Sequence, residues 1–316
     1  MNNKKILILG GAGALGKTLI KKYYDTNEII IFSRDEHKHY YLLKDYPKLK
    51  SVIGDIRDPQ SIMHVLHTYK PTIVINAAAL KHVPMCQSNP YESIKTNIIG
   101  HQHVIDSVQT FGGVEALIFV STDKACKPIN VYGMCKALAE ELYIKYANSQ
   151  STTKVVLVRY GNVLESTGSV IPLFKGILKS GASILPITHM YMTRFLLTLD
   201  DATALIENAY NSQDSHGKIA IPKVKSLRIV DVADALIKQY GPTDIKLVEV
   251  GIRPGEKLHE EMISSEEWAR SVEYDKFFLI GNTIVRNEIK SYNSLDSLMA
   301  ATEAYNFLKI SGVFND

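Results

Sequence analysis

Residues 5 to 16 read Lys-Ile-Leu-Ile-Leu-Gly-Gly-Ala-Gly-Ala-Leu-Gly, and this stretch decides the fold. The apolar run from Lys5 to Leu9 predicts a buried strand, and the glycine-rich turn after it opens a helix. The spacing of Gly10, Gly13 and Gly16 allows a tight turn and lets backbone N–H groups approach a pyrophosphate at the helix N-terminus. The pattern therefore predicts a dinucleotide-binding unit.

Strands and helices continue to alternate as far as about Val158. Further strands are predicted at Glu28 to Phe32, Ser51 to Ile53, Thr72 to Ile75, Ala116 to Val120 and Lys154 to Val158. Helices are predicted at Pro59 to Tyr69, Ile94 to Val108 and Tyr132 to Tyr146. This order predicts an α/β fold of the Rossmann type, in which a doubly wound parallel sheet carries helices on both faces.

The alternation breaks after Asn162, where Pro and Gly become frequent. A strand at Phe195 to Leu199 and helices at Asp201 to Tyr210 and Ile229 to Tyr240 are predicted later in the chain. We expect residues 1–165 to form the dinucleotide-binding domain, with 194–212 returning to it. Residues 166–193 and 213–316 are expected to form a smaller, discontinuous α/β lobe that binds the substrate.

The composition is ordinary for a globular protein of 316 residues, with 46% hydrophobic and 22% charged residues and a net charge of +3. No run of Lys and Arg resembles a nucleic-acid tail, and no apolar run reaches the ~18 residues of a membrane helix. The first strand begins almost at Met1, so we expect no signal peptide. Three cysteines without a CxxC pair, and histidine pairs without matching acidic or cysteine ligands, favour a cytoplasmic protein that binds no metal.

The residues after the second strand select the cofactor. Ser33 and Arg34 supply a hydroxyl and a guanidinium, which suit a 2′-phosphate and favour NADP over NAD. Asp35 leaves NAD open, although its carboxylate can also pair with Lys38. The residues predicted to bind the cofactor are Gly10, Gly13, Ala14, Leu15, Gly16, Ser33, Arg34, Lys38, Asp55, Ile56, Ala77, Ala78, Ala79, Asn97, Tyr132 and Lys136.

Residues 121 to 136 carry the candidate catalytic groups. Tyr132 and Lys136 are four apart and share one face of a helix, where the ammonium would lower the pKa of the phenol. Asp123 and Lys124 lie just past a strand end, where open α/β sheets place their ligands. Two alternatives stay open: an ordinary surface ion pair at Asp123 and Lys124, and a solvated helix face at Tyr132 and Lys136.

These motifs resemble the extended short-chain dehydrogenase/reductases, through the glycine-rich turn, Asn76 to Ala79 and Tyr132-x-x-x-Lys136. Further segments resemble UDP-N-acetylglucosamine 4,6-dehydratases of the soluble kind that also invert C5. These segments are 78–84 (AALKHVP), 95–100 (KTNIIG), 121–125 (STDKA), 192–195 (MTRF) and 251–260 (GIRPGEKLHE). The resemblance runs from about Lys4 to Ser264.

The resemblance implies a mechanism and an NADP cofactor that is recycled. Tyr132, activated by Lys136, would take the proton of the sugar 4-hydroxyl, while Thr122 would bond the reacting oxygen. Lys124 would remove the C5 proton, which needs a depressed pKa, and Asp123 would protonate the leaving 6-hydroxyl, which needs a raised pKa. The product would be UDP-2-acetamido-2,6-dideoxy-β-L-arabino-hex-4-ulose, a precursor of deoxyamino sugars in glycans.

The same resemblance assigns the substrate site and the assembly. Residues expected to bind the UDP-sugar are Lys81, Tyr160, Asn162, Arg194, Arg253 and Glu256. A homo-oligomer, either a dimer or a hexamer, is expected. The chain departs from the family pattern after Val163, because Glu165 replaces a glycine and Thr167 an arginine. Alternative functions are a C5-retaining 4,6-dehydratase, a UDP-hexose 4-epimerase and a non-catalytic NADP(H) sensor.

Overall fold

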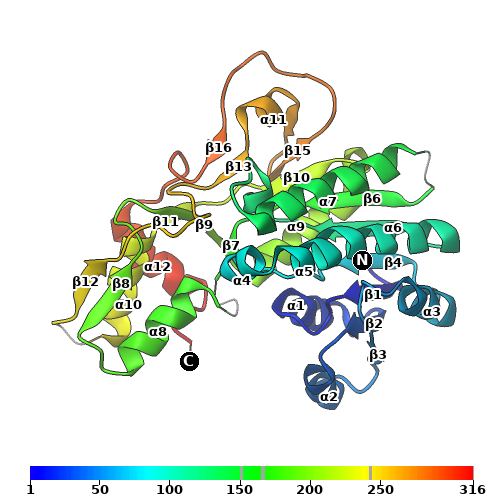
Figure 1. Ribbon diagram of the computed structural model, residues 1–316, viewed down its shortest axis with the longest axis horizontal. Helices are drawn as coiled ribbons and strands as arrows, with labels where there is room; N and C mark the ends of the chain where they lie inside the picture. Colours follow the sequence, from blue (N-terminus) through cyan, green and yellow to red (C-terminus); the bar gives the residue numbers. More distant parts are fainter. Residues whose placement is uncertain (150–151, 165–167, 242–243, 316) are drawn as a thin grey trace.

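The computed structural model describes residues 1–149, 152–164, 168–241 and 244–315, and its centre is a large sheet (Figure 1). In these residues the sheet has nine strands in the order β14-β15-β10-β6-β5-β4-β1-β2-β3. All neighbouring pairs from β10 to β3 are parallel, while the pairs β10–β15 and β15–β14 are antiparallel. The strands are β1 Lys5–Leu9, β2 Glu28–Ser33, β3 Lys50–Ile53, β4 Ile73–Asn76, β5 Ala116–Val120, β6 Lys154–Val158, β10 Ile219–Pro222, β14 Ser271–Glu273 and β15 Phe277–Ile280. The predicted fold class is confirmed.

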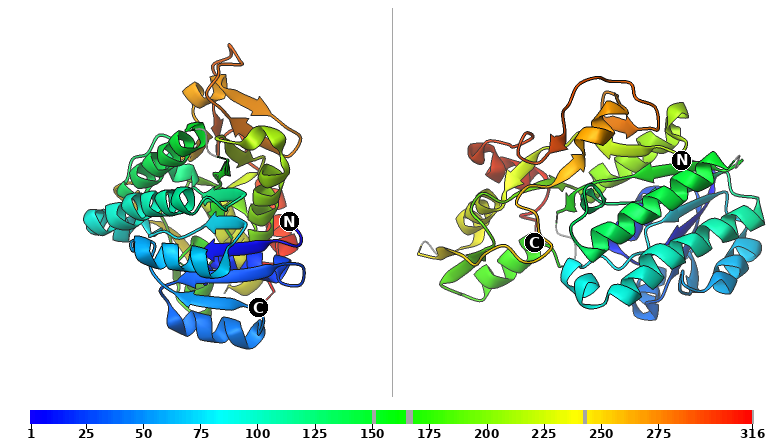
Figure 2. Two further views of the ribbon diagram at one scale, coloured as in Figure 1. Left: turned by 90° about the vertical axis from the view of Figure 1, so that its right-hand side faces the viewer. Right: turned by 45° about the horizontal axis from the view of Figure 1, so that its top comes forward.

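Both faces of the sheet are covered by helices. Successive strand residues point to opposite sides, so the apolar strands present apolar side chains on both faces. Leu7 and Leu9 face one apolar cluster, while Ile6 and Ile8 face the other. The first face carries α3 (Pro59–Tyr69), α6 (Gly100–Phe111) and α7 (Val131–Asn148), and the second carries α1 (Ala14–Tyr23) and α9 (Leu199–Asn211). Figure 2 shows α6 and α7 lying along the sheet.

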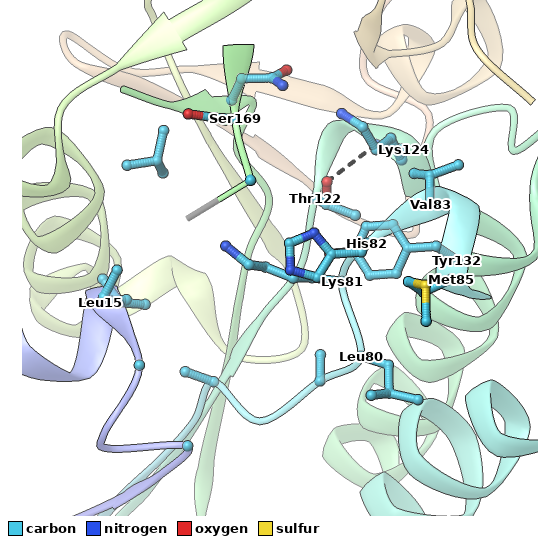
Figure 3. Close-up of a pocket in the computed structure, with 18 of the residues that line it drawn as sticks. Leu15, Leu80, Lys81, His82, Val83, Met85, Thr122, Lys124, Tyr132 and Ser169 are labelled. Atoms are coloured by element: carbon cyan, nitrogen blue, oxygen red, sulfur yellow. Dashed lines mark hydrogen bonds between the residues drawn. The ribbon is translucent and has the colours of Figure 1, made fainter. Parts of the chain in front are cut away.

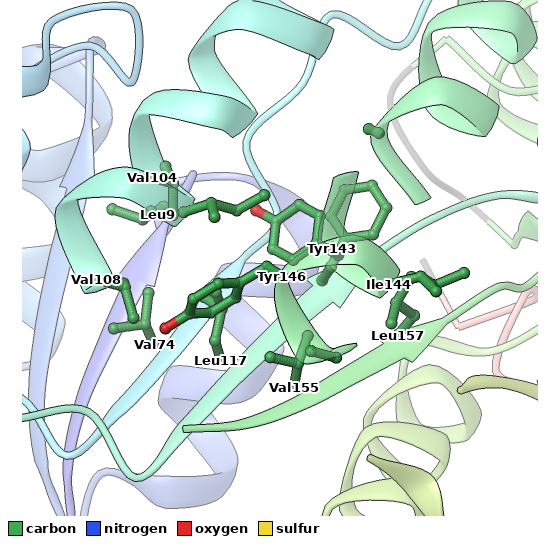
Figure 4. Close-up of a cluster of buried hydrophobic side chains, with 14 of the residues drawn as sticks. Leu9, Val74, Val104, Val108, Leu117, Tyr143, Ile144, Tyr146, Val155 and Leu157 are labelled. Carbon is green, nitrogen blue, oxygen red and sulfur yellow. The ribbon is translucent and has the colours of Figure 1, made fainter. Parts of the chain in front are cut away.

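Figure 4 shows how the first face is filled. Val104 and Val108 of α6 and Tyr143 of α7 pack onto Leu117 and other strand residues. Full burial of each such aliphatic side chain stabilises the fold by roughly 1.5–3 kcal/mol. The boundaries of α3 follow from its sequence, since Asp58 accepts a hydrogen bond from the backbone of Gln60 and a proline occupies the first turn.

A third apolar cluster, separate from the two on the sheet, forms the core of a smaller lobe. It packs α8 (Val170–Lys179), α10 (Ile229–Tyr240) and α12 (Ala301–Ile310) around the parallel pair β8 (Ile184–Ile187) and β12 (Lys246–Glu249). A three-stranded sheet joins the lobe to the main body; its strands are β11 (Ser226–Arg228), β9 (Thr193–Leu197) and β7 (Asn162–Val163). None of the helices in the described ranges is long and apolar enough to cross a membrane.

One part of the expected domain division is wrong. Strands β10, β14 and β15 fall within 213–316, which was assigned to the lobe, yet they extend the large sheet. The four residues of β10 are all buried, and pairing with β6 satisfies a sheet edge that would otherwise be open. The remaining boundaries stay a proposal, and the one between 165 and 166 lies outside the described residues.

The remaining elements are short and connect these layers. They are α2 Glu36–Asp45, α4 Val83–Ser88, α5 Pro90–Ile94, the π-helix η1 Lys95–Ile99, the 3₁₀ turns η2 Asp123–Ala125 and η3 Gln213–Ser215, β13 Glu261–Ile263, α11 Ser265–Ala269 and β16 Tyr292–Asn293. Several of them border the carboxyl ends of the parallel strands, where open α/β sheets bind ligands.

Candidate active site

A cavity of about 1010 Å³ opens at the carboxyl ends of the parallel strands and extends to the smaller lobe (Figure 3). The structure brings nearly all the predicted site residues to its wall. These are Gly10, Gly13, Ala14, Leu15, Gly16, Ser33, Arg34, Lys38, Asp55, Ile56, Ala77, Ala78, Ala79, Lys81, Thr122, Lys124, Tyr132, Lys136, Tyr160, Asn162, Arg194, Arg253 and Glu256. Asn97 and Asp123 are fully buried and do not line it.

The glycine-rich turn leaves room for a ligand at the start of α1. Gly10 has φ +79°, and a Cβ there would lie 2.8 Å from the backbone nitrogen of Ala78. A Cβ on Gly16 would lie 2.1 Å from the carbonyl oxygen of Gly11, so the helix can approach this closely only with glycine. The first turn of α1 has no acidic residue and no side-chain cap. Its free N–H groups fit the pyrophosphate of a dinucleotide.

The end of β2 presents cations to the cavity. The Arg34 side chain is 54% exposed, and its guanidinium lies 3.7 Å from a carboxylate oxygen of Asp55. Asp35 caps α2 by accepting a hydrogen bond from the backbone of Lys38, whose ammonium lies 2.6 Å from the same carboxylate. The carboxylate of Asp35 therefore has partners within α2, and Arg34, Asp35 and Lys38 all border the cavity.

Asn97 supports the cavity wall from behind. Its side chain accepts a hydrogen bond from the N–H of Leu80 at 2.9 Å and donates one to the carbonyl of Leu80 at 2.8 Å. It lies in the π-helix η1, a geometry that is frequent at functional sites. This arrangement holds the segment from Ala77 to Lys81 in place, so Asn97 acts on the cavity through that segment.

The segment after β5 carries a buried charged cluster. Asp123 is fully buried, accepts a hydrogen bond from the Thr122 hydroxyl at 2.9 Å and pairs with the Lys124 ammonium at 2.9 Å. Lys124 also lies 3.6 Å from Glu260, which in turn lies 3.8 Å from Arg194. The second carboxylate oxygen of Asp123 has no partner among the described residues. The alternative of an ordinary surface ion pair is therefore excluded.

The pKa of Lys124 is shifted in the direction opposite to the one that a base at this position needs. Burial acts to lower the pKa of this ammonium, but the charges of Asp123 and Glu260 outweigh burial and hold the pKa above its ordinary value. Glu260 was not among the predicted site residues, although it stands in the quoted segment 251–260. An acidic residue next to a histidine gives no local signal of a partner that is distant in sequence.

The expected effect of Lys136 on Tyr132 is also not found. Burial raises the pKa of the Tyr132 phenol, and the charge of Asp123 raises it further. Lys136 instead donates to the carbonyl of Val120 at 2.6 Å and lies 4.0 Å from the centre of the Phe119 ring. Burial lowers the pKa of Lys136 to about 7. Both side chains are buried, which excludes a solvated helix face.

The lobe supplies cations to the other end of the cavity. Arg194 is nearly buried and donates to the carbonyl of Thr193 at 2.8 Å, which fixes its guanidinium at the cavity wall. Arg253 is 57% exposed and lies 3.8 Å from Glu256. The side-chain oxygen of Asn162 is buried without a partner among the described residues. These groups fit an anionic ligand with polar substituents. Glu165 and Thr167 lie outside the described residues.

A buried network that the sequence did not predict lies beneath the catalytic candidates. Arg159 donates two hydrogen bonds to Glu140 of α7, at 2.6 and 3.0 Å, and one to Glu267 of α11 at 2.8 Å. The hydroxyl of Ser121 donates to Glu140. The network ties α7 to the ends of β5 and β6, and therefore fixes Lys136 relative to Lys124.

The strand order β3-β2-β1-β4-β5-β6, the glycine turn and the Tyr132/Lys136 pair on α7 define the class of the protein, the extended short-chain dehydrogenase/reductases. Within this class, the chain belongs to the family described as polysaccharide biosynthesis protein, whose pattern matches residues 6–282.

Known proteins are similar over most of the chain. The UDP-N-acetylglucosamine 4,6-dehydratase (inverting) of Campylobacter jejuni is 41% identical, over 90% of this chain and 84% of that protein. A UDP-glucose 4-epimerase of Rickettsia canadensis is 38% identical, over 88% of this chain and 83% of that protein. The solved structure of Pen from Bacillus thuringiensis superposes with a TM-score of 0.91 at 30% identity and covers 99% of both chains. The resemblance predicted from the motifs is confirmed.

Proposed function

We propose that the protein is an NADP-dependent lyase, a UDP-N-acetylglucosamine 4,6-dehydratase that also inverts C5. The observation that carries the proposal is the grouping of three proton-transfer groups at one wall of the cavity. Lys124 and Tyr132 line this wall, and Asp123 lies buried behind it, where it pairs with Lys124 and accepts a hydrogen bond from Thr122. Similarity to the Campylobacter jejuni dehydratase supports the same activity.

Each group would have a separate role. Tyr132 would accept the proton of the 4-hydroxyl, and Thr122, beside Asp123, would orient the reacting oxygen. Lys124 would take the C5 proton and Asp123 would protonate the departing 6-hydroxyl. Because Lys124 has a raised pKa between Asp123 and Glu260, it needs to lose its proton before it can act as a base.

The cofactor would be held by the glycine turn and by the end of β2. The nicotinamide would store a hydride temporarily, so that the sugar undergoes no net oxidation. Gly10, Gly13 and Gly16 would admit the pyrophosphate, and Arg34 and Lys38 would bind a 2′-phosphate. The engagement of Asp35 with Lys38 and with the N-terminus of α2 supports NADP over NAD, because these contacts compete with hydrogen bonds from ribose hydroxyls.

The substrate diphosphate would contact Arg194 and Arg253, and Glu256 would accept from the uridine ribose. Asn162, Tyr160 and Lys81 would complete the pocket around the sugar and phosphates. The product proposed is UDP-2-acetamido-2,6-dideoxy-β-L-arabino-hex-4-ulose, which would enter the synthesis of deoxyamino sugars.

A UDP-hexose 4-epimerase is the second candidate, because relatives such as the Rickettsia canadensis protein carry that name. An epimerase needs Tyr132 and Lys136 but has no need of an acid and a base for C5 and C6. The buried pair of Asp123 and Lys124 therefore favours dehydration.

Proton NMR of the protein with UDP-N-acetylglucosamine in D₂O, with and without added NADP⁺, tests the proposal. A new C6 methyl signal, deuterium at C5 and L-arabino couplings are expected. A product with retained D-xylo configuration would keep dehydration and reject inversion. Formation of UDP-N-acetylgalactosamine alone would replace the proposal with the epimerase.

A further inference from the structure

A histidine lies directly beneath the residues that are proposed to bind the 2′-phosphate. His39 of α2 is only 2% exposed, and its Nε2 lies 2.6 Å from the hydroxyl of Ser33. Its Nδ1 lies 2.6 Å from the hydroxyl of Ser51 in β3. Ser33 closes β2 and lines the cavity, whereas Ser51 does not. The three side chains therefore form a chain of hydrogen bonds that ends at the cofactor site.

The tautomer of the His39 imidazole determines which group donates in each of these hydrogen bonds. Burial lowers the pKa of His39, against the smaller opposing effect of the Asp35 charge, so the ring is neutral near neutral pH. A neutral ring has one donor and one acceptor nitrogen. If Ser51 donates to Nδ1, the Nε2–H donates to the oxygen of Ser33, and the Ser33 hydrogen is free to point into the cavity. In the opposite tautomer Ser33 donates to the ring and offers only lone pairs.

The surroundings favour the first direction. Arg34 and Lys38 border the cavity together with Ser33. Each has a carboxylate neighbour, Asp55 and Asp35, but both also carry N–H donors that suit an anion with only acceptor oxygens. A hydroxyl that donates to a phosphate makes a charge-assisted bond, roughly twice as strong as a bond to a neutral ribose hydroxyl. A Ser33 fixed as a donor therefore discriminates between the two cofactors at the 2′ position.

We propose that His39 is a positioning residue for cofactor selection. The hydrogen bond from Ser51 fixes the tautomer of His39, and the His39 ring then holds Ser33 as a hydrogen-bond donor toward the cavity. This arrangement increases the preference for a 2′-phosphate over a 2′-hydroxyl. The inference rests on the NADP assignment of the proposed function. It gives a role in cofactor selection to a residue that does not line the cavity. His39 differs in this respect from Arg34 and Lys38, which act by charge at the cavity wall.

Calorimetric titration of the full chain with adenosine 2′,5′-bisphosphate and with adenosine 5′-monophosphate tests the inference without turnover. Ser33→Ala is expected to weaken binding of the bisphosphate about tenfold and to leave the monophosphate nearly unchanged. Ser51→Ala removes a half-buried hydroxyl that does not line the cavity, and it is expected to weaken binding of the bisphosphate by a smaller factor, about threefold.

The decisive result is the combination of the two substitutions. If the serines act through His39, Ser51→Ala has no further effect in the Ser33→Ala background, and the double-mutant cycle is non-additive. His39→Leu is expected to weaken binding of the bisphosphate as Ser51→Ala does. If His39→Leu does not fold, the two serine variants and their combination still test the inference. Additive effects, or an unchanged preference in Ser51→Ala, would overturn the inference alone. A wild-type protein with no preference for the bisphosphate would overturn the NADP assignment together with it.

Discussion

Two lysines line one cavity from two regions of the molecule, and their charges are controlled in opposite ways. Lys124, in the turn after β5, lies between Asp123 and Glu260, and the pKa of its ammonium is raised. Lys136, in the second turn of α7, lies against the Phe119 ring and a carbonyl, and burial lowers its pKa to about 7.

The difference shows that burial alone does not determine the state of a lysine. Burial lowers the pKa in both regions, and the outcome depends on whether a carboxylate is available. Lys136 also has a carboxylate nearby in Glu140, whose charge acts to raise its pKa. Glu140 is bound by two hydrogen bonds from Arg159, so its charge is largely compensated, and it does not reverse the effect of burial.

The largest expected effect comes from substituting the two charged residues in the turn after β5. The double substitution Asp123→Asn with Lys124→Ala removes both the proposed acid and the proposed base, and dehydration is expected to fall by about 10²–10⁴-fold. Product formation followed by NMR measures the loss. Lys127→Ala, which removes an exposed lysine in the same loop, is the matched control and is expected to retain activity. An unaffected double variant would favour the epimerase.

The next effect concerns the network that holds the two regions together. Arg159→Met leaves Glu140 and Glu267 buried without their cation, and it is expected to lower the free energy of unfolding by about 3–5 kcal/mol. Urea unfolding measures this loss. Lys223→Met breaks an exposed pair with Glu273 and is expected to cost about 0–1 kcal/mol. Equal costs for the two variants would show that the buried network contributes no more than a surface pair.

The environment of Lys136 predicts a pH dependence of stability. The pKa of Lys136 is about 7 in the folded protein and 10.5 ordinarily. Between these two pH values the lysine is protonated in the unfolded chain and mostly neutral in the folded protein, so the free energy of unfolding rises with pH. Relative to Lys136→Met, the wild type is expected to gain up to about 1.4 kcal/mol per pH unit above about pH 7. Urea unfolding at several pH values measures the slope. Lys145→Met, exposed on the same helix, is the control, and equal slopes in all three proteins would refute the lowered pKa.

The smallest effect tests the contribution of Glu260 to Lys124. Glu260→Gln removes one of the two carboxylates that raise the pKa of Lys124, so this pKa is expected to fall. If Lys124 acts as the base, the acid limb of the pH–rate profile moves to lower pH by the same amount. Glu261→Gln, whose partner is the exposed Lys127, is the control. Identical profiles for both variants would exclude coupling between Glu260 and Lys124.

The sequence by itself determined the features that depend on near neighbours. The turn at Gly10 to Gly16 and the alternation of strands and helices predicted the parallel sheet, because a glycine turn and a hydrophobic period are local properties. The predicted helix Pro59–Tyr69 has the observed bounds, because its cap and first-turn proline are adjacent in the chain. Nearly all the site residues that the motifs identified line the cavity.

Only the tertiary structure decided the features that join distant segments. Strands β10, β15 and β14 became part of the large sheet, at one side of it, through pairings that no local pattern specifies. Glu260 reached Lys124, and His39 came to lie between Ser33 and Ser51, through long-range packing. The protonation of Lys124 and Lys136 followed from burial and from neighbouring charges, which a spacing of residues does not encode because both depend on the folded surroundings.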